Sequence, residues 1–141
     1  MKQINGFTLF EMLLTIVILA SLVLLAVPSI FSTIQKQEIA QFFKILDSDI
    51  LYIQNQALGT RQNVRIVFDQ EYYAVLTERQ SEEIKRYYPK QLTHEVKINN
   101  RLSFSNNGTV INPTTYLFKD KDTTYHLVFP LGKGRHYIEQ Q

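Results

Sequence analysis

A continuous apolar segment near the start of this chain has a single carboxylate at its entrance. Met12–Phe31 spans twenty residues without an ionisable side chain, and Glu11 immediately precedes it. At about 1.5 Å per residue, a helix of this length extends about 30 Å, the thickness of the hydrocarbon core of a bilayer. The segment therefore predicts a transmembrane helix, and a glutamate at its edge is costly unless another group pairs with the charge.

Two common explanations for an N-terminal apolar segment account for only part of this pattern. A secretory signal peptide has an apolar stretch of about 7–15 residues before a small-x-small cleavage site, whereas this stretch is longer and no convincing site of that kind follows it. A plain membrane anchor gives no reason for Gly6, Phe7 and Glu11 at their spacing. Cleavage after Gly6 would supply a partner, because it creates an α-amine at Phe7, about one helical turn from Glu11.

Residues 6–11 read Gly-Phe-Thr-Leu-Phe-Glu, and with the apolar run they resemble the class III signal of type IV pilins and pseudopilins. The resemblance implies that a prepilin peptidase cuts between Gly6 and Phe7 and methylates the new amino terminus of Phe7. It also implies that Glu11 pairs with the terminal amine of a neighbouring subunit during filament assembly. Pro28 matches the proline that the family usually carries in this helix.

The expected roles of Glu11 and Pro28 have physical reasons. A subunit that docks one turn out of register would leave the Glu11 carboxylate unpaired, so the pair fixes register even if it adds little net stability. Pro28 cannot donate a helix hydrogen bond, and we expect a kink or local unwinding there. The alternative is a proline that is simply tolerated in a membrane helix.

The remaining sequence predicts one more domain. We expect a leader at 1–6, a transmembrane helix at 7–31, an amphipathic extension of that helix at 32–59 and a β-rich head at 60–141. The chain has no cysteine, which excludes disulfides, thiolate metal sites and a cysteine nucleophile. A net charge of +2 does not by itself indicate a nucleic-acid-binding protein.

Hydrophobic periodicity predicts an α+β fold of the type IV pilin kind. Apolar residues recur every three or four positions in the extension, at Ile39, Phe42, Leu46, Ile50, Ile53 and Ala57, before a stop at Gly59. Strand patterns follow at 63–68, 72–77, 84–88, 94–98, 101–105, 114–118, 123–129 and 135–139, with turn signals at 69–71, 106–108, 120–122 and 131–134. We therefore expect a long helix packed on an antiparallel β-sheet head.

The second half of the chain carries a further resemblance. Residues 102–108, the strand at 114–118 and Gly134-Arg135 resemble the last hairpins of the minor pseudopilin group that includes GspH and FimT, with the ComGD family as its member in Gram-positive competence systems. This resemblance implies a non-enzymatic subunit of a DNA-uptake pilus at the cell surface, without a cofactor. Its partners would be the prepilin peptidase, other pilins and, indirectly, an assembly ATPase and membrane platform.

Two alternatives stay open on the sequence alone. One is a minor pseudopilin of a type II secretion system or of another type IV pilus. The other is a membrane-anchored binding domain that does not polymerise. The histidines are isolated in the sequence, and no pair has the spacing of metal ligands.

A basic group near the last two turns is a candidate DNA contact. It comprises Lys119, Lys121, Lys133 and Arg135, with tyrosines interleaved. Such residues can meet phosphates and bases. The competing interpretation is a solvated sheet edge whose lysines block unwanted strand pairing.

Overall fold

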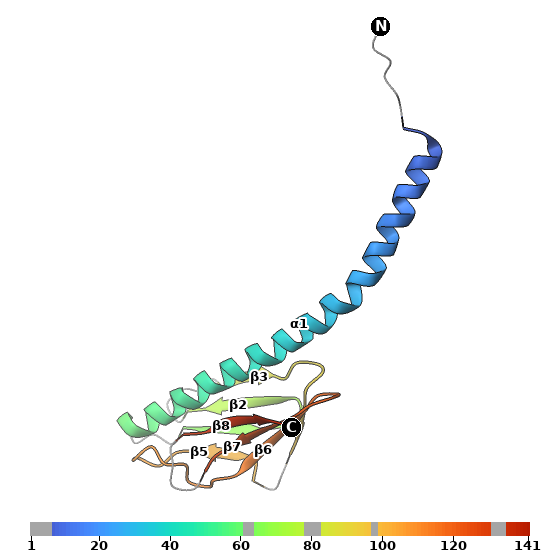
Figure 1. Cartoon of the computed structure of the whole chain (residues 1–141). Helices are drawn as coiled ribbons and strands as arrows, with labels where there is room; N and C mark the ends of the chain where they lie inside the picture. Colours follow the sequence, from blue (N-terminus) through green and yellow to red (C-terminus); the bar gives the residue numbers. More distant parts are fainter. Residues whose placement is uncertain (1–6, 61–63, 78–82, 97–98, 131–134) are drawn as a thin grey trace. The chain divides into compact units, whose positions relative to one another are not determined.

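The computed structural model describes residues 7–60, 64–77, 83–96, 99–130 and 135–141. The chain divides into two compact units, Met1–Gln37 and Glu38–Gln141. Helix α1 (Leu9–Thr60) contributes to both units, and all the strands belong to the second (Figure 1).

The first unit consists, in its described part, of the apolar half of α1. Among the described residues, α1 is the one helix long and apolar enough to cross a membrane, and none of its most apolar window is buried. Its leucine, isoleucine and valine side chains are exposed, for example Leu13, Leu19 and Leu25. Exposed apolar surface on this scale is expected for a segment that lies in lipid. The helix and the motif before it fit a membrane-anchored precursor.

The second unit holds two four-stranded antiparallel sheets. Sheet A has the strand order β3-β2-β1-β5, and sheet B has the order β4-β6-β7-β8. The strands of sheet A are β1 (Arg65–Phe68), β2 (Tyr72–Leu76), β3 (Ile84–Tyr87) and β5 (Arg101–Ser103). Those of sheet B are β4 (Thr93–Glu95), β6 (Thr115–Lys119), β7 (Thr124–Val128) and β8 (Tyr137–Gln140).

The structure confirms the α+β fold: one long N-terminal helix is followed by antiparallel β-sheets. Each of the eight strand patterns in the sequence overlaps an observed strand, and the expected hairpins β1–β2 and β6–β7 are formed. The Asn-Gly turn is also present, with Gly108 at a φ of 77° and Phe104 bridged to Val110. The expected turn at 131–134 lies outside the described residues, although β7 and β8 do pair.

The division of the head into two sheets was not predicted. β4 and β5 are neighbours in the sequence, but β5 pairs with β1 in sheet A and β4 pairs with β6 in sheet B. Short strands in one chain segment can join different sheets because each needs a partner with a matching apolar face.

The core of the second unit lies between α1 and the two sheets. The helix residues predicted to form its apolar face are all buried: Ile39, Phe42, Leu46, Ile50, Ile53 and Ala57. Phe118 of β6 has ring centroids of Phe42, Phe43 and Phe68 within 5.6–6.1 Å, so it joins the helix to both sheets. Edge-to-face arrangements of this kind stabilise the core beyond the apolar area that they bury.

Candidate functional site

The first candidate site is the start of α1, where Thr8 and Glu11 form a capping box. The backbone N–H and the hydroxyl of Thr8 each lie 3.0 Å from Glu11 Oε2, and the backbone N–H of Glu11 donates to Thr8 Oγ1 at 3.2 Å. This arrangement satisfies donors that a helix start otherwise leaves without partners. The sequence Thr-x-x-Glu is a direct signal for it, which our sequence analysis did not use.

Before assembly, the capping box already gives the Glu11 carboxylate two hydrogen-bond donors, both from Thr8. Its hydrogen bonds with Thr8 use Oε2, so Oε1 stays outside the capping box. A carboxylate accepts up to about four hydrogen bonds, so the cap and an ammonium can share it. Phe7, the expected first mature residue, precedes the cap with 78 % of its surface exposed. Gly6, on the other side of the expected cleavage point, lies outside the described residues.

Position 28 lies within α1, which continues to Thr60. The kink or unwinding expected at Pro28 stays a prediction, as do the processing at Gly6-Phe7 and the assembly role of Glu11.

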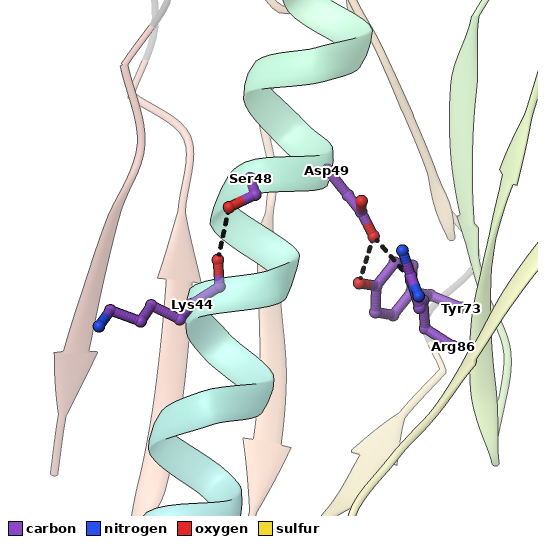
Figure 2. A network of polar contacts seen from close by, with 5 residues as sticks. All are labelled: Lys44, Ser48, Asp49, Tyr73 and Arg86. Atoms are coloured by element: carbon purple, nitrogen blue, oxygen red, sulfur yellow. Dashed lines mark hydrogen bonds and ion pairs between the residues drawn. The ribbon is translucent and has the colours of Figure 1, made fainter.

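A second candidate site is a polar network that ties α1 to sheet A. Asp49 Oδ2 accepts a hydrogen bond of 2.7 Å from the Tyr73 hydroxyl and lies 3.3 Å from Arg86 Nε (Figure 2). Tyr73 is fully buried, and burial together with the Asp49 charge raises the pKa of its hydroxyl far above the usual range. The hydroxyl therefore stays protonated and acts as a donor to Asp49.

Figure 2 shows the geometry of this network. The Asp49 side chain reaches from the helix toward Tyr73 and Arg86, which come from β2 and β3, whereas the Lys44 side chain extends from the other side of the helix. Ser48 donates to the Lys44 carbonyl within the helix at 3.0 Å. The network joins a donor, a carboxylate and a cation by direct contacts between the helix and sheet A, so its chemistry fits a structural tie.

We expect Tyr73→Phe to lower the free energy of unfolding by about 2 kcal/mol, because it removes a hydrogen bond to a charged acceptor. Tyr137→Phe is the matched control, since Tyr137 is exposed and its change should cost no more than about 0.5 kcal/mol. Urea unfolding of the full chain in detergent micelles measures both. Equal effects of the two substitutions would show that the Tyr73–Asp49 bond contributes no stability of its own.

His136 forms a second tie between the helix and the end of the chain. Its Nε2 lies 2.9 Å from Asp47 Oδ1, and its ring packs against Phe129 at a centroid distance of 5.3 Å. Burial lowers the pKa of His136, and the neighbouring Asp47 charge opposes that shift. This histidine looks isolated in the sequence, because Asp47 is distant in the chain.

The structure separates the basic residues that the sequence suggested as a DNA contact. Lys119 and Lys121 lie at the turn between β6 and β7, and Lys119 pairs with Glu95 at 3.4 Å. Arg135 precedes β8, whose first residue, Tyr137, pairs with Val128 at the other end of β7. Lys133 lies outside the described residues. The described members therefore occupy opposite ends of sheet B, about 15 Å apart by the rise of a five-residue strand.

In the part of the chain that the structure describes, no group of three or more histidine and acidic side chains is placed to hold a metal ion.

Comparison with known proteins gives one match. The model of the prokaryotic N-terminal methylation motif matches residues 1–27. No curated protein and no solved structure matches the chain. The motif suggests a type IV pilin or pseudopilin, a class of structural proteins, and it implies processing by prepilin peptidase and assembly as a pilin. The helix and antiparallel sheets have the layout of that class.

Proposed function

We propose that the chain is a minor pseudopilin of a competence pilus, a structural subunit of the filament that takes up DNA in transformation. In this proposal a prepilin peptidase cleaves between Gly6 and Phe7 and methylates Phe7. The subunit then leaves the membrane and joins other pilins, with an assembly ATPase and membrane platform supplying the work indirectly. The head of the mature chain lies at the cell surface, and a Gram-positive cell is the expected source.

The observation that carries the pilin part of the proposal is the methylation motif at residues 1–27, which leads directly into a long apolar helix. The competence part rests on the resemblance of the β-rich second half to the ComGD family. Two antiparallel sheets against one helix suit a subunit that presents a rigid surface, because their core is continuous through Phe118.

In the proposed filament, the exposed apolar half of α1 packs among the same helices of neighbouring subunits. Glu11 enters that apolar environment as a charge and pairs with the methylated amine of Phe7 in a neighbour. A buried pair of this kind is costly to break, since the remaining charge is then left in an apolar medium.

The experiment is deletion of the gene in the cells that produce the chain. We expect transformation to fall to background and to recover with a plasmid copy, and mass spectrometry of the native protein to find methylated Phe7 as its first residue. A chain that still begins at Met1, in cells that process their other pilins, would contradict the whole proposal.

The same deletion separates the alternatives. Retained transformation with loss of an exported enzyme would identify a type II secretion pseudopilin. Retained transformation and secretion, with the chain absent from sheared filaments, would identify a membrane-anchored domain that does not polymerise.

A further inference from the structure

The outer face of sheet A gathers exposed cations, one exposed tyrosine and one half-buried tyrosine from four strands. The inner face carries the buried residues Ile66, Phe68, Tyr73, Val75 and Leu102. Because neighbouring residues of a strand point to opposite faces, the alternate positions face outward. Those positions include three basic and two aromatic side chains, Arg65, Lys85, Arg101, Tyr72 and Tyr87, and they also hold Val67, Ala74, Leu76 and Ser103.

Two arginines lie on one side of this basic face, on β1 and on the edge strand β5. Arg65 is directly opposite Ser103, and Arg101 is directly opposite Val67, so the two arginines are diagonal neighbours on β1 and β5. Diagonal pairs in an antiparallel sheet are about 7–8 Å apart at the backbone. Both arginines are exposed, and within the described residues neither of them forms an ion pair. Two like charges held side by side, with no carboxylate of the described residues paired to either, favour an anionic partner.

The aromatic side of the basic face lies on β2 and β3. Tyr72 is opposite Tyr87, and their ring centroids are 5.8 Å apart. Lys85 Nζ lies 5.0 Å from the centroid of Tyr72 and 3.3 Å from Glu83 Oε2. Tyr87 keeps 69 % of its surface exposed. Beside the two arginines, this side of the face therefore presents Lys85, whose charge Glu83 partly neutralises, and the exposed hydroxyl-bearing ring of Tyr87.

Acidic residues are missing from the strands of sheet A. β1, β2, β3 and β5 read RIVF, YYAVL, IKRY and RLS, without a carboxylate among them. Among the residues that the structure describes, Glu83, just before β3, pairs with Lys85 of the face. In sheet B, by contrast, the strands carry Glu95 and Glu139 beside their basic residues. The positive charge of the head's described strands is thus concentrated on sheet A.

We propose that the basic face of sheet A binds the phosphate backbone of duplex DNA. Arg65 and Arg101 pair with phosphates, since a guanidinium matches two phosphate oxygens at once, and the Tyr87 hydroxyl donates to a further phosphate or sugar oxygen. An exposed sheet face suits contacts along the outside of a duplex, where no pocket is needed. The site deepens the proposed function and rests on it, because it assigns the DNA contact of a DNA-uptake filament to residues outside the basic group first suggested by the sequence.

The test measures binding of a fluorescent duplex oligonucleotide to the full chain in detergent micelles, as a function of salt. The variant is Arg65→Gln with Arg101→Gln. The matched control is Lys119→Gln with Lys121→Gln, which removes the same charge from the turn of sheet B. Circular dichroism checks that each variant keeps the fold, as expected for exposed side chains.

We expect the arginine variant to bind at least tenfold more weakly, with the slope of log K against log salt reduced by about two. The lysine variant should bind within about twofold of the wild-type chain and keep its salt slope. Equal losses in both variants, or no loss in the arginine variant, would overturn the assignment. Binding confined to a single-stranded oligonucleotide of the same length would also overturn it, because base stacking would then replace backbone contact.

Transformation of cells that carry the arginine variant separates this inference from the proposed function. Suppose that gene deletion abolishes transformation but the arginine variant transforms normally. This result would refute DNA binding by the basic face and would leave the proposed role in a competence pilus intact. Normal transformation after gene deletion would refute the competence role, and arginine-dependent DNA binding in micelles would then still stand on its own.

Discussion

A chain with Glu11→Gln is expected to enter the membrane at the wild-type level and to be almost absent from filaments. Glutamine keeps the size of the side chain and can still cap the backbone N–H of Thr8, because capping boxes accept glutamate or glutamine. The substitution therefore removes the negative charge and little else. An ammonium left without its partner in an apolar medium costs about 3–5 kcal/mol, or about two to four orders of magnitude in subunit association.

Membrane fractionation and sheared filaments, probed on the same cells, measure the two amounts separately. Thr8→Ala is the matched control, because it removes the hydroxyl from the cap at a cost of about 1 kcal/mol but retains the Glu11 charge. It should reduce assembly far less than Glu11→Gln does. Normal assembly of the Glu11→Gln chain would show that the filament does not use this carboxylate, whatever its other pilin features.

The helix and strands could be predicted from local sequence because their signals are local. A spacing of three and four identified the buried face of α1, and turn residues such as Asn107-Gly108 marked where strands end. Phe43 was not predicted as a core residue, although it is buried beside Phe42. It contacts Phe118 and Tyr125 of sheet B, so its burial follows from a second sheet that the helix pattern alone does not reveal.

Strand partners could not be predicted in the same way. β1 pairs with β5, and β4 with β6, across long stretches of intervening chain. Such pairings depend on which apolar faces fit together in the whole head, and adjacency in sequence favours a different arrangement. The two-sheet architecture is the consequence, and the sequence contains no short motif for it.

The polar network of Asp49 and the basic face of sheet A could not be predicted from the sequence for the same reason. Asp49, Tyr73 and Arg86 come from three elements and meet only when the helix lies against sheet A. Arg65 and Arg101 become neighbours only through the β1–β5 pairing. Lys121 and Arg135 are closer in sequence but lie toward opposite ends of sheet B. The cap at Thr8 and Glu11 differs, because its four-residue signal was available in the sequence.

Leu46→Ala is expected to cost the second unit about 3 kcal/mol of unfolding free energy. Leu46 is fully buried, and it faces the core beside Phe42, Phe43 and Ile50. Truncation removes the transfer free energy of three carbons and leaves a cavity that ring-shaped neighbours cannot fill by small shifts. For a domain of about 100 residues, this loss corresponds to a fall in Tm of roughly 12–20 °C.

Leu51→Ala is the matched control for that substitution, since it makes the same chemical change in the same helix at a side chain that is 47 % exposed. Alanine also favours the helix slightly over leucine, so the control should change stability by less than about 1 kcal/mol. Thermal unfolding of the full chain in micelles, followed by near-ultraviolet circular dichroism, reports on the tyrosine-rich core of the head. If Leu46→Ala and Leu51→Ala lowered Tm equally, the second half of α1 would not be held against the two sheets by the face that the sequence pattern and the structure both assign to it.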